Sequence, residues 1–315
     1  MGTRPTVALF AGDPAGVGPE IVAKLLAEPE TTRTADVLLI ASRASMDARA
    51  QATLVEWKGL EAPAFPLGVA GPDNGRFMLD GLSTGVDLVR SGKADALCFA
   101  PLNKGALRAG GMNHPDEMHW FAEVLGWTGP CVEFNVLEDL WTSRITSHVP
   151  LKDVASLLNI EGVADGIGLL YQGLQAAGKH SPRLAVCGFN PHNGDNGNFG
   201  REEIDVIAPG VKRAAERGWP AAGPFPADTI FVRALNKDAG GGYDGIVTMY
   251  HDQGQIAMKL MGFERGVTVQ GGLPIPITTP AHGTAYDIAG KGKANVGAMR
   301  NAFLLACRMS AARNT

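Results

Sequence analysis

The residues Thr6-Val-Ala-Leu-Phe-Ala-Gly-Asp-Pro-Ala-Gly-Val-Gly-Pro-Glu20 join a strand pattern to a helix start, and this junction decides the fold class. Thr6 to Ala11 form a short apolar run, which is typical of a buried strand. Pro19 stands at the first turn of the expected helix, where its missing N–H does no harm. A buried strand that leads directly into a helix is the repeating unit of a parallel α/β sheet.

The same alternation continues along the chain. Further apolar runs predict strands at Val37 to Ala41, Ala94 to Ala100, Val132 to Asn135, Arg183 to Gly188 and Gly245 to Tyr250. Amphipathic segments predict helices at Pro19 to Ala27, Gly75 to Ser91, Val163 to Ala177, Ile204 to Arg217 and Asn295 to Ala312. The pattern therefore predicts an α/β protein with a largely parallel sheet, whose ligands bind beyond the carboxyl ends of the strands.

Length and charge narrow the class of partner. With 315 residues the chain is long enough for two domains or one large α/β domain. A formal net charge of -4 without a basic block argues against nucleic acid or an anionic membrane and favours a small molecule. No run approaches a membrane span and no secretory signal is recognisable, so we expect a cytoplasmic protein. The widely spaced Cys98, Cys131, Cys187 and Cys307 are interpreted as buried free thiols.

Three of the seven histidines follow apolar strand patterns. They lie in Arg144-Ile-Thr-Ser-His-Val-Pro150, Phe189-Asn-Pro-His-Asn-Gly194 and Met249-Tyr-His-Asp-Gln-Gly254. Each alone would be an ordinary loop histidine, but together His148, His192 and His251 could bind one divalent ion and leave positions open for substrate oxygens.

The neighbouring motifs resemble a known family. Gly12-Asp-Pro-Ala-Gly-Val-Gly-Pro-Glu20, Asn190-Pro-His-Asn-Gly-Asp-Asn-Gly-Asn-Phe-Gly-Arg-Glu-Glu203 and Tyr250-His-Asp-Gln-Gly254 are similar to motifs of the 4-hydroxythreonine-4-phosphate dehydrogenase family of vitamin B6 biosynthesis. The resemblance runs from about residue 6 to residue 311.

The resemblance implies a two-domain α/β fold like that of isocitrate and isopropylmalate dehydrogenases, with the active site in the interdomain cleft at a homodimer interface. We expect a cofactor-side domain at residues 1–130 and 270–315 and a metal, substrate and dimerisation domain at 131–269. By the same resemblance, histidines 148, 192 and 251 bind the metal, which could be Zn, Mn, Co or Mg, with ligands drawn from both subunits.

The resemblance also assigns active-site residues. Asp228 matches an active-site acid, Lys259 matches a substrate-contacting lysine, and Lys104 is a further candidate cation. Without the family, Asp228 would be a helix cap, Lys259 a solvated helix residue and Lys104 an exposed loop lysine.

The cofactor signal is Ala281-His-Gly-Thr-Ala-Tyr-Asp-Ile-Ala-Gly-Lys-Gly-Lys-Ala-Asn295, which looks like the adenosine-binding segment of isocitrate and isopropylmalate dehydrogenases. We expect Gly283, Thr284, Ala285, Asp287 and Ile288 to bind the cofactor. A carboxylate at Asp287 would repel a 2′-phosphate, which predicts NAD rather than NADP. The alternative is a glycine-rich loop that caps the last helix.

The earlier glycine turn at Gly16 is as well explained by a structural turn as by phosphate binding, since the third glycine of the usual fingerprint is absent.

The substrate positions depart from the family pattern. Glu117 and Met118 stand where the family has His and Thr, Thr268 replaces an asparagine, and Ile277 replaces an arginine. Loss of that arginine and gain of Glu117 disfavour a phosphate dianion. The substrate is therefore expected to be a small hydroxy acid, either phosphorylated as in the family and its threonate or erythronate phosphate branches, or a cis-dihydrodiol carboxylate of the terephthalate type. His119 or Arg108 could compensate for the lost phosphate contacts.

The alternative to an enzyme is a non-catalytic metal-binding protein with the same fold.

Overall fold

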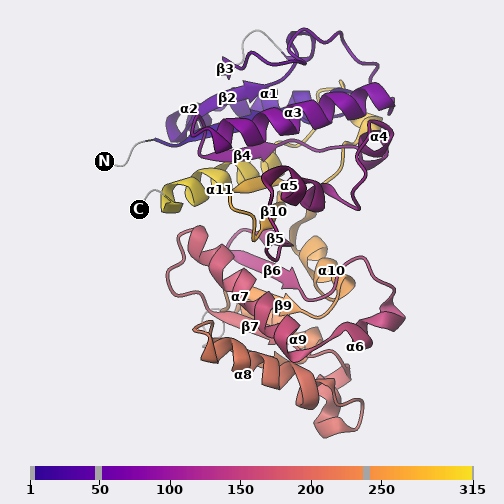
Figure 1. Ribbon diagram of the computed structural model, residues 1–315, viewed down its shortest axis with the longest axis vertical. Coiled ribbons are helices and arrows are strands. Elements are labelled where there is room, and N and C mark those ends of the chain that lie inside the picture. The colour runs from indigo at the N-terminus through magenta and orange to yellow at the C-terminus, as the bar shows by residue number, and fades with distance from the viewer. Residues whose placement is uncertain (1–3, 47–51, 237–241, 314–315) are drawn as a thin grey trace. The chain divides into compact units, whose positions relative to one another are not determined.

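The computed structural model describes residues 4–46, 52–236 and 242–313 (Figure 1). The chain divides into two compact units, one of Met1–Cys131 with Glu264–Thr315, the other of Val132–Phe263. The sequence-based boundaries were expected at residues 130/131 and 269/270. In the first unit the chain returns after the whole second unit has been completed, so its last helix packs on its earliest strands.

The first unit is built on a mixed sheet whose strand order is β3-β2-β1-β4-β11-β10. Its strands are β1 (Thr6–Phe10), β2 (Asp36–Ile40), β3 (Thr53–Leu54), β4 (Ala96–Phe99), β10 (Val267–Gly271) and β11 (Ile277–Pro280). All of the neighbouring pairs are parallel except β10 with β11, which is antiparallel.

Helices cover both faces of this sheet. They are α1 (Gly18–Leu26), α2 (Pro29–Thr34), α3 (Pro72–Arg90), α4 (Lys104–Ala109), α5 (Glu117–Leu125) and α11 (Gly297–Arg313). Short 3-10 turns lie at Arg43–Ser45, Phe263–Arg265 and Tyr286–Ile288. Helix α3 packs against β1 with Phe10, Met78 and Leu82 in one buried cluster. Helix α11 packs against β4 and β11, and the buried Thr278 hydroxyl donates to the Ala302 carbonyl at 2.9 Å.

The crossing of α3 and α4 depends on two glycines. A Cβ on Gly75 would lie 1.9 Å from the Ala106 carbonyl oxygen, and one on Gly110 would lie 2.4 Å from the Gly75 carbonyl carbon. We expect Gly75→Ala to destabilise the protein by about 1–3 kcal/mol, because the added methyl forces two backbones apart. Chemical denaturation measures this loss. Gly71→Ala is the control, since its Cβ would meet only Asn74 Oδ1 at 3.7 Å; an equal loss in both variants would refute the explanation.

The second unit repeats the α/β pattern with strand order β5-β6-β9-β7-β8. Its strands are β5 (Val132–Leu137), β6 (Leu140–Arg144), β7 (Leu184–Cys187), β8 (Ala221–Phe225) and β9 (Gly245–Thr248). Its helices are α6 (Val154–Leu157), α7 (Ile160–Ala176), α8 (Ala208–Glu216), α9 (Ala227–Leu235) and α10 (His251–Gly262). Irregular helical turns occupy Leu151–Asp153, Pro191–Gly197 and Glu203–Ile207. Helices α9 and α10 share one buried cluster with Ile246 and Cys187, while α7 packs on β6 and β9 and also contacts α8.

The expected α/β class is confirmed. Each predicted strand and helix has a counterpart, with ends that differ by a few residues. The sequence patterns did not predict strands β3, β6, β8, β10 and β11 or helices α2, α4, α5, α6, α9 and α10, because these segments are short or mix polar with apolar residues.

The cysteines are free, as predicted, and Cys98, Cys187 and Cys307 are buried, whereas Cys131 is only partly buried, contrary to the prediction. Burial raises the pKa of each of these three thiols to about 12, so their reactive thiolates are scarce at neutral pH. Among the described residues no single helix is long and apolar enough to cross a membrane; only the bent pair Leu151–Leu157 and Ile160–Ala176 reaches that criterion together.

Candidate active site

His148 and His251 lie close together at one edge of the second sheet. Strands β6 and β9 are parallel neighbours with Arg144 opposite Thr248, so the segments that follow both strands leave the sheet side by side. The hydroxyl of Thr146 donates to the Met249 carbonyl at 2.8 Å and ties these segments together. As a result the two imidazole rings have their centroids 5.8 Å apart.

Both rings stand in constrained surroundings. His148 has a left-handed backbone with φ of 52°, a conformation that costs an L-residue roughly 1–2 kcal/mol. The His251 ring is oriented by a 2.7 Å contact between its Nδ1 and the carboxylate of Asp252. Strained backbone that is maintained by its surroundings is typical of functional sites.

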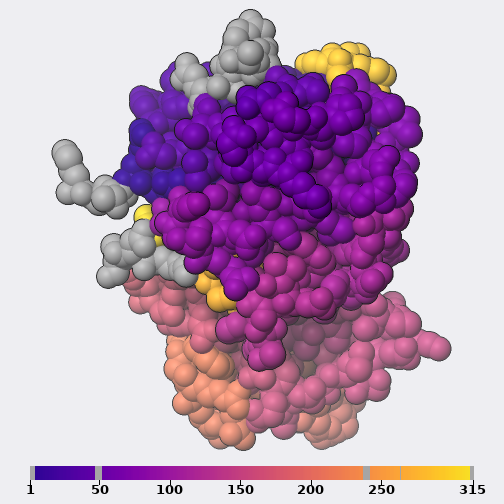
Figure 2. Space-filling view, turned by 45° about the horizontal axis from the view of Figure 1, so that its top comes forward, coloured from indigo at the N-terminus to yellow at the C-terminus, as the bar shows by residue number. Residues whose placement is uncertain are grey.

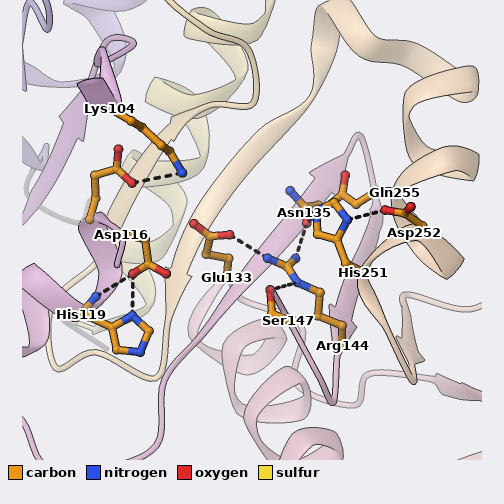
Figure 3. A network of polar contacts seen from close by, with 11 residues as sticks. Lys104, Asp116, His119, Glu133, Asn135, Arg144, Ser147, His251, Asp252 and Gln255 are labelled. Carbon is orange, nitrogen blue, oxygen red and sulfur yellow. Dashed lines mark hydrogen bonds and ion pairs between the residues drawn. The ribbon is translucent and has the colours of Figure 1, made fainter. Parts of the chain in front are cut away.

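A buried arginine lies beside the segments that carry these two histidines, and Figure 3 shows it with its partners and His251. Arg144 is 6% exposed; its guanidinium donates to Ser147 Oγ at 2.8 Å, to Asn135 Oδ1 at 3.0 Å and to Glu133 Oε2 at 2.7 Å. Ser147 directly precedes His148, and Asn135 also accepts a hydrogen bond from Gln255, one turn after His251 in α10. The network therefore links the segments that carry both rings.

His192 occupies a loop of unusual geometry. The five residues His192 to Asn196 all have left-handed backbones, with φ values of 52°, 59°, 77°, 43° and 56°. The imidazole is exposed and packs near Phe199, with ring centroids 6.3 Å apart. Within residues 4–46, 52–236 and 242–313 no group of three His, Cys, Asp or Glu side chains is arranged to hold a metal ion. One chain thus brings two of the three predicted ligands together and places His192 apart from them. The paired imidazoles, whose ring nitrogens are suitable metal ligands, fit a borderline divalent ion.

The other two candidates of the second unit are exposed helix residues. Asp228 lies in the first turn of α9 and Lys259 on α10, two turns after His251. Asp228 is not the helix cap, because the N-cap position is Pro226 and no side chain caps the helix. Its carboxylate nevertheless stands where the helix dipole favours negative charge.

The first unit gathers Lys104, Glu117 and Met118 around the start of α5. Lys104 begins α4, and its exposed ammonium lies 3.6 Å from the Glu117 carboxylate, which is largely buried like the Met118 side chain. In the same turn Asp116 caps α5 and contacts His119 Nδ1 at 2.6 Å, as Figure 3 shows. A half-exposed imidazole is thus oriented by a buried carboxylate.

The two remaining substrate candidates lie in paired strands. Thr268 is partly buried in β10 opposite Thr279 of β11. Ile277 begins β11 opposite Leu97, is 0% exposed and belongs to the hydrophobic core. In this structure its side chain therefore offers a ligand no surface.

The expected cofactor segment forms a loop that is fastened to α1. The Val17 amide donates to the Thr284 carbonyl at 3.0 Å, Glu20 accepts from the Gly292 and Ala294 amides, and Lys24 donates to the carbonyls of the same two residues. Burial alone would raise the pKa of Glu20, but the hydrogen bonds from Lys24 and the two amides lower it. The loop leaves Gly283 and Asp287 exposed, with open space around the Gly283 α-carbon, while Thr284, Ala285 and Ile288 are half-buried. An exposed carboxylate on a fixed loop fits the recognition of a ribose hydroxyl.

The glycine turn before α1 is structural. Ala11 to Gly18 are buried, and a Cβ on Gly18 would lie 2.2 Å from the Ala11 carbonyl oxygen. The Gly16 amide donates to the Asp13 carbonyl, and the buried Asp13 carboxylate accepts from Ala15, Asn74 and Tyr286. Burial and this contact with Asp13 raise the pKa of Tyr286. The turn has no exposed amides for a phosphate, which decides between the two interpretations left open by the sequence.

Sequence reasoning missed Arg144 and Glu203, the two buried charges beside the histidine loops. Arg144 was visible only as the last residue of an unpredicted strand. Glu203 ends the Asn- and Gly-rich motif, and its position directly after a loop too polar for a core was the available signal.

Taken together, the two α/β units with histidines beyond the carboxyl ends of parallel strands define a protein with the fold of the isocitrate dehydrogenase class. The isocitrate dehydrogenase of Methylococcus capsulatus shares that fold, with a TM-score of 0.52, 16% identity and coverage of 98% of this chain and 88% of that one.

The chain belongs to the family described as pyridoxal phosphate biosynthetic protein PdxA, whose sequence pattern matches residues 19–306. A Pseudomonas aeruginosa relative with the provisional name 4-hydroxythreonine-4-phosphate dehydrogenase 2 is 53% identical over 97% of both chains. A Bradyrhizobium diazoefficiens relative, provisionally named D-threonate 4-phosphate dehydrogenase, is 38% identical over 97% of this chain and 96% of that one.

Solved structures agree with this assignment. The 4-hydroxythreonine-4-phosphate dehydrogenase of Klebsiella pneumoniae has a TM-score of 0.82, 31% identity and 98% coverage of both chains. A terephthalate 1,2-cis-dihydrodiol dehydrogenase from Burkholderia xenovorans has a TM-score of 0.69 and 27% identity, and covers 96% of this chain and 98% of that one. The family to which the chain belongs is thus one whose named relatives are dehydrogenases.

Proposed function

We propose that this protein oxidises a hydroxyl group of a small 3-hydroxy acid with NAD and one divalent metal ion, and that loss of carbon dioxide follows. The observation that carries the proposal is the pairing of His148 and His251, 5.8 Å apart between ring centroids, on segments fixed by Arg144. Family membership supports the same chemistry.

Each group of side chains at the proposed site would have a separate role in the reaction. His148, His192 and His251 would hold the ion, which when bound makes the substrate hydroxyl more acidic and withdraws electrons from it. Asp228 would accept the hydroxyl proton as hydride leaves the same carbon for the nicotinamide ring. Lys259 and Lys104 would orient the anionic groups. The carboxylate carbon would then leave as carbon dioxide, and a proton delivered by an acid or water would take its place on the neighbouring carbon.

The relatives and the residues Glu117 and Ile277 support two candidate substrate classes. Relatives are named for 4-hydroxythreonine 4-phosphate and D-threonate 4-phosphate, which makes a phosphorylated hydroxy acid the first candidate. Ile277 in the core and Glu117 beside Lys104 favour the second, a cis-dihydrodiol carboxylate, because neither provides a cationic contact for a phosphate dianion.

Initial rates of NADH formation with these acids, each with Mn²⁺ or Zn²⁺, test the proposal directly. Reduction of NAD with one class only would identify the substrate. No reduction with any member, together with no thermal stabilisation by NAD when the metal is present, would instead favour a metal-binding protein without catalysis.

NAD preference is expected to depend on Asp287. Asp287→Asn should raise kcat/KM for NADP relative to that for NAD by about tenfold, since a carboxylate beside the ribose repels a 2′-phosphate and an amide does not. Steady-state kinetics with both nucleotides measure the ratio. Asp73→Asn, an exposed carboxylate on α3, is the control; an unchanged ratio in Asp287→Asn would place the adenosine elsewhere.

We also propose a homodimer with a shared active site. The segment that follows His148 exposes apolar side chains, with Leu151 66% and Leu157 46% exposed, and it projects at the right edge of Figure 2 in pink. Exposed apolar side chains next to a site favour contact with a partner chain. The double substitution Leu151→Glu with Leu157→Glu should shift the protein to monomer in sedimentation and abolish activity. Val232→Glu, on α9, is the control for surface charge; a fully active monomer would contradict a shared site.

A further inference from the structure

We infer that Glu203 is a positioning residue that sets the conformation of the loop carrying His192, so that this imidazole is presented to the metal ion. This inference rests on the proposed function for the role of the metal. Its structural part depends only on contacts within the second unit.

The loop needs an external support. His192, Asn193, Asp195 and Asn196 have side chains and yet adopt left-handed backbones, with Gly194 between them. Such a run is unfavourable for L-residues and persists only where the surroundings impose it. The support must therefore come from groups packed against the turn.

Glu203 supplies that support. Its side chain is buried, with 3% exposure, and Oε1 accepts from the Phe189 amide at 2.7 Å and the Asn190 amide at 2.6 Å. Oε2 accepts from the Asn190 side chain at 3.0 Å. The same oxygen would lie 2.6 Å from a Cβ on Gly194, so the left-handed turn rests directly on the carboxylate.

The charge of Glu203 is satisfied by this loop. Among the described residues no lysine or arginine forms an ion pair with it, since Arg201 pairs with Asp205 instead. Burial alone would raise the pKa of Glu203, but the hydrogen bonds from Asn190 and Phe189 lower it. A buried carboxylate whose partners all belong to one loop acts on that loop.

A second contact connects the same loop with the helix of His251. The Gln253 side chain donates to the Gly188 carbonyl at 2.8 Å and accepts from the Met249 amide at 2.7 Å. The chain that enters the loop is thereby fixed at three consecutive residues, at Gly188 by Gln253 and at Phe189 and Asn190 by Glu203. Ligands of a metal ion commonly depend on such supporting groups.

The test uses Glu203→Gln in the full-length protein. A glutamine has the same size but must direct an NH₂ group at one set of loop donors, where no acceptor is available. We expect amide hydrogen exchange at Phe189 and Asn190 to accelerate in the metal-free protein. We also expect affinity for Zn²⁺, measured by competition with a chromogenic chelator, to fall about 10- to 100-fold.

Glu202→Gln is the matched control. Glu202 accepts from the Asn190 side chain at 2.6 Å, and a glutamine oxygen can keep that bond. Its Zn²⁺ affinity should stay within about threefold of the unchanged protein. If Glu203→Gln does not fold, Glu203→Asp, which keeps the charge and retracts it by one methylene, should show the same two changes against Glu202→Asp.

Unchanged exchange and unchanged Zn²⁺ affinity in the Glu203 variants would overturn the inference. If the unchanged protein binds no Zn²⁺ or Mn²⁺, the proposed function and the metal part of the inference both fail. Hydrogen exchange would then still decide whether Glu203 holds the loop.

Discussion

His251→Ala is expected to lose divalent-metal binding and NAD reduction together. One of the two adjacent imidazoles disappears, which leaves the proposed ion with only two of its three histidine ligands. Loss of the metal removes several kcal/mol of charge stabilisation in the transition state, which corresponds to a fall in kcat of about a thousandfold or more. Chelator competition measures binding, and initial NADH formation measures catalysis. His192→Ala should behave in the same way.

The control for this experiment is His180→Ala, an exposed histidine outside the candidate site. It should bind metal and turn over at the rates of the unchanged protein. A His251→Ala variant that folds, binds the ion and reduces NAD normally would contradict the metal assignment. Retained metal binding with lost catalysis would instead give His251 a role in the chemistry.

The second large effect is expected at Arg144. Arg144→Met removes a buried guanidinium, leaves the partly buried Glu133 carboxylate without its ion-pair partner and removes one of the hydrogen bonds that Asn135 accepts. Breaking a buried pair on one side costs about 3–5 kcal/mol, because the other charge stays desolvated. Chemical denaturation should show this loss in the free energy of unfolding. Since Arg144 also orients Ser147, metal affinity should fall in the same variant.

A double substitution separates the charge from the packing. Arg144→Met with Glu133→Leu removes both charges, so a large part of the lost stability should return. Metal affinity should stay low, because the hydrogen bond to Ser147 is still missing. Arg201→Met breaks the exposed pair with Asp205 and should cost much less than Arg144→Met, because water screens the exposed charges. If Arg144→Met costs no more than this control, the arginine does not stabilise the site.

The structure shows which residues of the candidate site could be predicted locally. His192 and His251 were recognisable because each follows a predicted apolar strand. His148 follows β6, which no predicted range covered, and only the parallel pairing of β6 with β9 brings it to the same edge of the sheet as His251. The fastening of the 281–294 loop to α1 could not be predicted. It joins Glu20 and Lys24 to residues more than 260 positions away, and no local pattern specifies such a pairing.

The burial of Ile277 and Arg144 could not be predicted from the sequence. Ile277 was chosen by its position in the family pattern, but β11 places it in the core between paired strands. Arg144 carried no sequence signal, because a buried arginine is stable only when its partners Glu133, Asn135 and Ser147 converge from other segments.

The sequence by itself determined the α/β class, the family, the free cysteines and the histidines that deserve testing. These follow from short-range patterns of apolar, glycine and polar residues, which depend on backbone preferences and solvation. The strand order, the pairing of His148 with His251 and the buried charges that support the histidine loops were decided only by the tertiary structure. These features depend on long-range pairing and burial, in which each group's energy is set by partners that are distant in the chain.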